Sequence, residues 1–353
     1  MGMTKRYSPI GIEIGVRSVQ AAQLAGSRGN WRFHAGVSVP LPVPNHPIDA
    51  AIARHLGDVL YRHGFVGEDV VLAAPVNQLE ADVLELPPRS SGAPVEQIAR
   101  LEMARSAKLE NEPFELECWD LPTPSRGAAG ASVMAVALRH AHANALLDPF
   151  DAAGLSVVAI DARCCALARA SMGYQQPDAM LAVLDVDWDF GQVALISQGM
   201  LVYQRSINES QLSMVCRSIG DEFQLEEDEI DYVLKQIGAG AEVADPEMSN
   251  LAQSRRIQQL ITRYLDTVMN EAETAFQYAA HRYAQTPIKT LLLTGPGAGI
   301  AGACGLIASR TNLETRVLSP ASIVECPKDL HPRCGDASLT VALGLAMNGA
   351  ARS

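Results

Sequence analysis

The same local pattern occurs once near the N-terminus of this chain and again near its middle. In the first copy, an apolar strand carrying Glu13 reaches a turn at Gly15, and β-rich runs follow. In the second copy, the apolar strand 180–187 carries Asp185 and leads through a turn into strands over 192–207. Two copies of one unit of strand, acid, turn and hairpin are typical of a duplicated fold. The sequence therefore predicts an α/β protein with two similar halves.

Additional segments follow each copy. After the first, the order strand, helix, strand, strand, helix predicts a small inserted subdomain, with elements at 79–86, from Pro94, 118–121, 132–138 and 140–153. After the second, helices are expected at 211–223, 227–236 and 251–283. The last of these helices carries apolar residues along one face, so we expect it to pack on a sheet.

A glycine-rich turn follows the apolar strand 290–294. Gly297, Gly299 and Gly302 form a G-x-G-x-x-G string, which would indicate a dinucleotide site if an acid that binds the ribose followed. The next strand, 315–318, ends without an acidic residue. The pattern therefore argues against a Rossmann fold and leaves another nucleotide-binding fold, or a turn whose small residues only allow close strand-to-helix packing.

Charge and composition exclude several classes of function. The net charge of −12 argues against a nucleic-acid partner, because phosphate contacts need clustered Lys and Arg. Apolar residues make up 48% of the chain, yet no run is long enough to span a bilayer, so we expect a cytosolic protein with real cores. Seven cysteines without C-x-x-C spacing favour reduced, mostly buried thiols. His140 and His142 point to different helix faces, so no zinc site is expected.

The order and spacing of these loops resemble the actin-like ATPase superfamily and, within it, the PilM family of type IV pilus assembly proteins, which is related to the division protein FtsA. Residues 12–19 stand at the family's first phosphate loop, 184–187 at its second, and 293–298 at its adenosine loop. The ending 335–346 is similar to its closing helix. The resemblance implies an actin-like (RNase H-like) duplicated fold of two halves with an FtsA/PilM-type inserted subdomain.

The resemblance also implies a division into four subdomains. Subdomain 1A would comprise residues 1–78 and 148–177, and the inserted subdomain 1C residues 79–147. Subdomain 2A would comprise residues 178–206 and 286–353, and the helical subdomain 2B residues 207–285.

Nucleotide-site residues are implied in the same way. The turn at Gly15 would bring backbone N–H groups to phosphates, and an acid at Glu13 or Asp185 would hold the water shell of Mg²⁺. The full set of candidates for binding ATP is Glu13, Gly15, Arg17, Ser18, Asp185, Lys235, Gly295, Gly297 and Ala298. No catalytic residue and no separate metal site are assigned. Each residue also has a plainer explanation, because glycines adopt positive φ in turns and acids cap strand ends.

Several positions depart from the family pattern, and the departures weaken nucleotide binding. Glu13 replaces an Asp, Val16 and Arg17 replace two serines, and Asp187 replaces a glycine. A carboxylate at Asp187 would repel a phosphate, and Pro296 removes one N–H donor from the third loop. We therefore expect binding of ATP and Mg²⁺ to be weak or lost, so that the cleft is degenerate. Arg17 could instead supply a replacement cation to a phosphate.

The function that the resemblance implies is that of a cytoplasmic scaffold of type IV pilus or related secretion machinery. In the family, a groove between the first subdomain and the insert binds the N-terminal cytosolic tail of PilN, an inner-membrane protein, so the membrane association is indirect. Here the groove would be lined by 79–147 and 70–74, with Val83, Leu84 and Leu86 as candidate contacts. Two alternatives stay open: a working ATPase or sugar kinase-like enzyme, and a self-associating filament former similar to FtsA or MreB.

Overall fold

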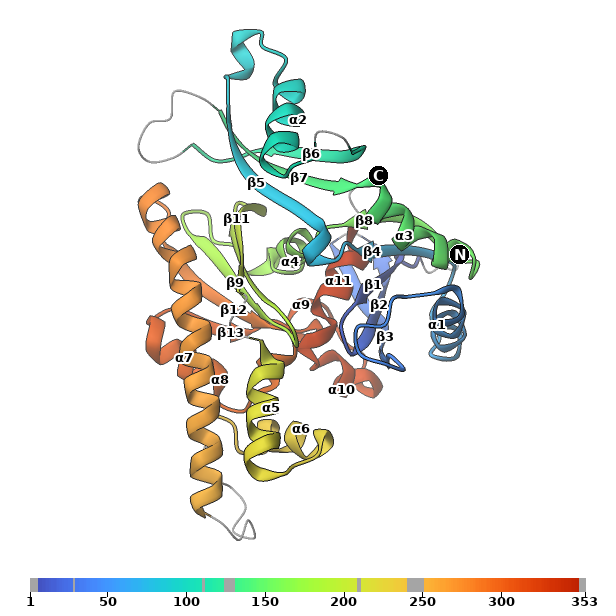
Figure 1. The fold of residues 1–353 in the computed structure, drawn as a ribbon, viewed down its shortest axis with the longest axis vertical. Coiled ribbons are helices and arrows are strands. Elements are labelled where there is room, and N and C mark those ends of the chain that lie inside the picture. Colours follow the sequence, from blue (N-terminus) through green and yellow to red (C-terminus); the bar gives the residue numbers. More distant parts are fainter. Residues whose placement is uncertain are drawn as a thin grey trace.

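Two five-stranded sheets and one three-stranded sheet form the framework of the protein (Figure 1). The computed structural model describes residues 6–27, 29–109, 112–123, 131–207, 211–239 and 251–348. No helix in these ranges combines the length and the apolar character that a membrane crossing requires.

The first sheet has the strand order β3-β2-β1-β4-β8. Its strands are β1 (Ile10–Ile14), β2 (Ser18–Ser27), β3 (Asn30–Pro40), β4 (Asp69–Ala73) and β8 (Ser156–Asp161). The first three strands form an antiparallel meander, and β4 and β8 then add in parallel. Strand β8 therefore forms one edge of this sheet.

The second sheet repeats this arrangement with the order β11-β10-β9-β12-β13. Its strands are β9 (Met180–Val186), β10 (Gly191–Ser197), β11 (Met200–Ile207), β12 (Ile288–Thr294) and β13 (Glu314–Val317). Again three antiparallel strands are followed by two parallel ones. The tight turn between β10 and β11 uses Gln198 and Gly199, both at positive φ, which suits a two-residue hairpin. The repeated sequence pattern thus corresponds to two sheets of one topology.

Two short helices fill the space between the sheets. Helices α4 (Arg163–Ala170) and α11 (Thr340–Ala346) share a core with apolar residues of both sheets, such as Val71 and Leu292. Their backbones approach closely, because a Cβ atom on Gly344 would collide with the backbone of Ala166. Burial on all sides explains why the residues of these helices, apart from Arg163 and Arg169 of α4, are small or apolar.

The outer faces of the sheets carry longer helices. Helices α1 (Ala50–Arg62) and α3 (His140–Asp151) cover the first sheet, and α5 (Leu212–Phe223), α6 (Glu227–Gln236), α7 (Leu251–Arg282) and α8 (Ala303–Thr311) pack with the second. Helix α7 matches the expected apolar face, since Ile257, Leu265 and Ala272 are all buried. The ends of the shorter helices follow local rules: Asp49 caps α1, and Glu226 and Glu229 form a capping box at α6.

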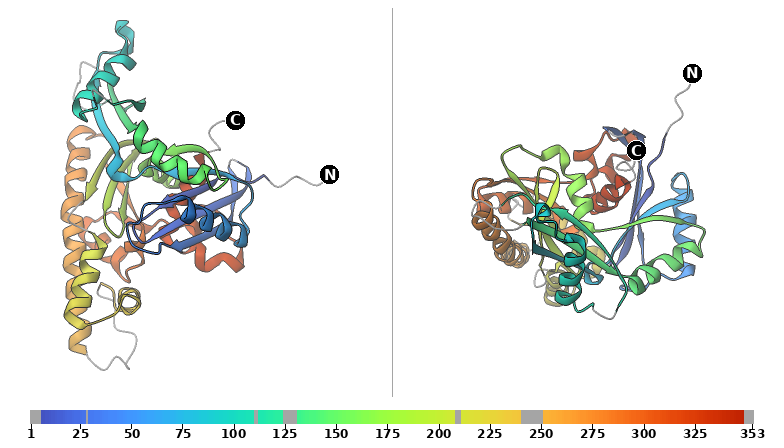
Figure 2. Two further views of the ribbon diagram at one scale, coloured as in Figure 1. Left: turned by 45° about the vertical axis from the view of Figure 1, so that its right-hand side comes forward. Right: turned by 90° about the horizontal axis from the view of Figure 1, so that it is seen from above.

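The insert is a three-stranded antiparallel sheet with one helix. Strands β5 (Leu79–Leu86), β7 (Ala131–Arg139) and β6 (Phe114–Asp120) pair in that order, and α2 (Val95–Ser106) packs on one face. The insert projects at one end of the molecule, beyond one end of α7 (Figure 2). Strand β6 begins at Phe114 and not at the expected Cys118, and from Phe114 its acids alternate with its apolar residues, as is usual for a half-buried strand.

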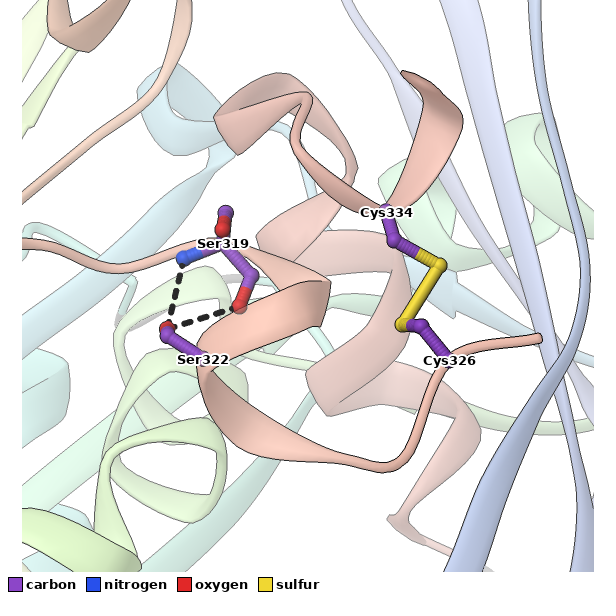
Figure 3. The surroundings of a disulfide bond; sticks show 4 residues. All are labelled: Ser319, Ser322, Cys326 and Cys334. Atoms are coloured by element: carbon purple, nitrogen blue, oxygen red, sulfur yellow. Dashed lines mark hydrogen bonds between the residues drawn. A yellow bond between two sulfur atoms is a disulfide. The ribbon is translucent and has the colours of Figure 1, made fainter. Parts of the chain in front are cut away.

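A disulfide joins Cys326 and Cys334, whose Cα atoms are 6.4 Å apart (Figure 3). Cys326 lies in the connection between α9 (Pro320–Ile323) and α10 (His331–Cys334), Cys334 is the last residue of α10, and Ser319 caps α9. The expectation that all seven cysteines are reduced is therefore wrong for this pair. Their sequence separation of 8 matches no common motif, and only the fold of this turn brings the two thiols together.

Candidate functional sites: an interdomain cleft and a groove beside the insert

A cleft of about 680 Å³ lies where the loops after β1, β9 and β12 meet. Seven of the nine predicted nucleotide-site residues line it: Glu13, Gly15, Arg17, Ser18, Lys235, Gly295 and Ala298. The other two, Asp185 and Gly297, lie behind its surface, because Asp185 is fully buried and Gly297 packs on Val186. The sequence thus identified residues that the fold brings together, from loops far apart in the chain.

A buried arginine that sequence analysis missed lies at the base of this cleft. Arg163 is the first residue of α4 and is only 5% exposed. Its Nε lies 2.6 Å from Oδ2 of Asp185, and its Nη2 lies 2.8 Å from Oδ2 of Asp187. Its remaining nitrogen, Nη1, pairs with the carboxylate of Glu13. One guanidinium therefore binds three carboxylates, which come from β1 and from the end of β9.

The electrostatics of this cluster keep the arginine charged. Burial acts to lower the pKa of Arg163, but the charges of Asp185 and Asp187 outweigh it and raise the pKa overall. Burial also raises the pKa of Asp187, and the positive charge of Arg163 offsets only part of that effect. Three carboxylates facing one guanidinium carry excess negative charge, so the base of the cleft repels an anion.

Arg17, the candidate phosphate-binding cation, also has partners within the protein. Its guanidinium lies 4.0 Å from the centre of the Trp188 ring, a cation–π distance, and pairs with Glu227 at the start of α6. Arg17 follows β1, whereas Trp188 and Glu227 belong to the other half of the chain. This side chain therefore bridges the cleft and is not directed at an open phosphate position.

The glycine-rich turn is shaped by close packing. Gly295 has φ of 78°, and a Cβ atom there would lie 2.6 Å from Oδ1 of Asp185. A Cβ atom on Gly297 would collide with the side chain of Val186. Both glycines are thus required by contact with the end of β9, whether or not a ligand binds beside them.

A second hollow, of about 520 Å³, lies between the insert and the first sheet, and we call it the groove. Its floor is the face of the insert's sheet that α2 leaves uncovered, including Trp119, Val136 and Leu138. One wall is β8, which contributes every residue from 157 to 161, and the other is α3, through Ala143 and Leu147. Val158 is 44% exposed there.

The three predicted partner contacts do not line this groove. Leu84 and Leu86 point to the opposite face of the insert's sheet, where α2 buries them in the core. Val83 lies farther along the uncovered face, beside Tyr203 and Arg282 of the second half. From the other predicted wall, 70–74, only Ala74 reaches the groove.

The sequence of this chain matches a known family, and its fold matches known structures. The model of the type IV pilus assembly protein PilM family matches residues 11–350. The chain belongs to the PilM family. No curated protein sequence matches the chain. Among solved structures, the PilM–PilN type IV pilus biogenesis complex is 19% identical, with a TM-score of 0.76, covering 97% of this chain and 98% of that one.

Two less similar solved structures confirm the expected fold class. The ethanolamine utilization protein EutJ from Carboxydothermus hydrogenoformans is 12% identical, with a TM-score of 0.54, and the match covers 98% of this chain and 90% of EutJ. MreB5 of Spiroplasma citri bound to AMPPNP is 14% identical, with a TM-score of 0.54 and coverage of 96% and 94%. This PilM-family chain therefore has the duplicated actin-like fold, and that fold can hold a nucleotide in other proteins.

Proposed function

We propose that this chain is a scaffold of type IV pilus or related secretion machinery that binds the N-terminal cytosolic tail of a PilN-like inner-membrane protein. Membership of the PilM family supports the role in pilus assembly. The similar PilM structure is that of a complex with PilN, which supports the partner. The protein would then lie on the cytoplasmic side of the inner membrane and reach the membrane through this partner.

The observation that carries the proposal is the groove beside the insert. Its floor and wall offer apolar side chains to solvent, among them Val158 and Leu147. An apolar groove with a few polar groups is the usual form of a peptide-binding site. It lies between two structural units, so a bound tail would contact both.

A tail peptide tests this function. We expect a synthetic peptide of the PilN-like tail to bind in isothermal titration, and we expect Val158→Lys to abolish binding by placing a charge in the groove. Leu101→Lys is the matched control, because Leu101 is 70% exposed on α2, on the far side of the insert's sheet. Binding that survives Val158→Lys, or that Leu101→Lys also abolishes, would remove the support for this groove.

We also propose that the cleft is a degenerate nucleotide site. The position of the guanidinium of Arg163 supports this, since it already pairs with the acids that would hold a metal shell in an ATPase. The pairing of Arg17 with Glu227 removes the replacement cation for a phosphate. The residues present therefore do not fit a magnesium triphosphate.

Titration with Mg-ATP separates the remaining alternatives. We expect no binding in the low-micromolar range and no phosphate release. Low-micromolar binding with turnover would favour the working ATPase instead. Sedimentation at rising protein concentration tests the third possibility, because a filament former would assemble and a scaffold of this kind would not.

A further inference from the structure

Strand β8 offers an unpaired edge to the groove. In the first sheet β8 pairs only with β4, and among the described residues no strand pairs with its other side. Successive side chains of a strand point to opposite faces, so a surface that contacts only one face is lined by alternate residues. Here five consecutive residues, 157–161, line the groove. The groove therefore runs along the edge of β8, where outward N–H and C=O groups have no strand partner.

An irregularity in β8 adds an apolar contact at this edge. The pairing with β4 shifts so that Val157 stands opposite Val70 and Ala159 opposite Val71, which leaves Val158 as an extra residue. Bulges at sheet edges often redirect a side chain. Val158 is the exposed apolar residue at this edge, and it would contact a chain lying beside β8.

The negative charge of the groove favours a bound peptide that carries basic residues. The charged residues that line it are Glu115, Glu117 and Asp161, all acidic. His140 pairs with Glu115, and Asp161 binds Arg169 and Asn348. Glu117, by contrast, has no ion-pair partner in the described part of the chain, and it projects from the floor of the groove.

We propose that the tail binds as an added strand on the free edge of β8, with a Lys or Arg of the tail paired to Glu117. This inference rests on the proposed function, because it specifies how the tail occupies the groove. Short cytosolic segments next to membrane helices are enriched in Lys and Arg, which fits an acidic groove. Strand addition supplies affinity through backbone hydrogen bonds, and alternate side chains of the tail would contact the floor of the groove.

Backbone methylation of the tail peptide tests the added strand. In an edge strand only every second N–H group faces the neighbouring strand. We expect N-methylation at alternate positions to weaken binding about tenfold or more, and methylation at the positions between them to have little effect. A scan without alternation would overturn the strand model while leaving the proposed function intact. No binding of the unmodified peptide would overturn both.

The charge contact has its own pair of variants. We expect Glu117→Lys to weaken binding of the unmodified peptide by about threefold to tenfold, with the difference shrinking at high salt. Glu96→Lys makes the same charge change at an exposed position on α2 and is expected to leave the affinity unchanged. Equal effects of the two substitutions would show that only net charge matters, and the assigned contact would be wrong.

Discussion

Arg163 and Asp185 join the two halves of the molecule through a buried ion pair, with Nε and Oδ2 2.6 Å apart. Arg163 begins the helix that follows the first sheet, and Asp185 lies on β9 of the second. Asp185 is fully excluded from solvent and also accepts a hydrogen bond from Gln192 at 3.1 Å. The place where an actin-like ATPase would coordinate a metal shell is thus held together by the protein's own cation.

Replacing Arg163 should strongly destabilise the protein. In Arg163→Met, the carboxylates of Glu13, Asp185 and Asp187 would lose their shared partner while remaining buried. Breaking a buried pair in this way costs about 3–5 kcal/mol. Urea unfolding followed by circular dichroism should show this loss in the free energy of unfolding.

An exposed arginine provides the control for that experiment. Arg316 pairs with Glu314 on β13, with both side chains about half exposed. Exposed pairs contribute about 1 kcal/mol or less, so Arg316→Met should change stability little. If Arg163→Met also costs less than about 1 kcal/mol, the cluster does not connect the halves energetically.

Adding Asp185→Asn and Asp187→Asn to Arg163→Met should recover part of the loss, because these changes remove the unpaired charges.

Stability should fall at alkaline pH, partly because of Cys216 on α5. Burial raises the pKa of Cys216 to about 12, whereas a thiol in the unfolded chain ionises near a pKa of about 8.5. Between these values the unfolded state binds fewer protons than the folded state, so the free energy of unfolding decreases as pH rises. The slope from this one group approaches about 1.4 kcal/mol per pH unit, and the effect becomes small below about pH 8.

Urea titrations at pH 8 and pH 10 measure the contribution of this thiol. Cys216→Ala should reduce the loss of stability between the two pH values by about 2 kcal/mol. Ser218→Ala, an exposed change on the same helix, should leave the loss as it is in the parent protein. An unchanged pH dependence in Cys216→Ala would show that other groups cause the alkaline loss.

The disulfide between Cys326 and Cys334 should stabilise protein kept without reductant. Closing so short a loop is worth about 2–3 kcal/mol in the chain-entropy account. Dithiothreitol should therefore lower the free energy of unfolding of the parent protein, but not that of Cys334→Ser. Alkylation of the denatured, unreduced chain should label only the five cysteines that are free in the structure. Labelling of all seven would mean that the bond does not form.

The architecture was predictable because it rests on local and repeated signals. Each copy of the strand, acid and turn unit can be read within a few residues, and the long helix α7 shows its apolar face over many turns. The order of these signals indicated two similar halves and an insert. The resemblance that followed from them identified seven residues that do line one cleft.

The sequence did not predict the Arg163 cluster or the lining of the groove, because both depend on contacts between segments far apart in the chain. Arg163 follows Ala162 at the start of an ordinary helix, and only the fold brings it to Glu13 and Asp187. In β5, alternation showed that Leu84 and Leu86 share a face, but not that α2 covers this face. The groove instead uses the opposite face, to which β6 contributes Glu115, Glu117 and Trp119.

Trp119 should report on binding in the groove. It lines the floor, and its Nε1 donates a hydrogen bond of 2.8 Å to the backbone oxygen of Leu201 on β11. A tail that covers the indole would change its solvent exposure, so the tryptophan emission should shift on titration with the tail peptide. Trp119→Phe should abolish the shift, whereas Trp31→Phe, which changes a residue outside the groove, should retain it. A shift that persists in Trp119→Phe would place the bound tail elsewhere, because Trp119 is the only tryptophan among the described residues that line the groove.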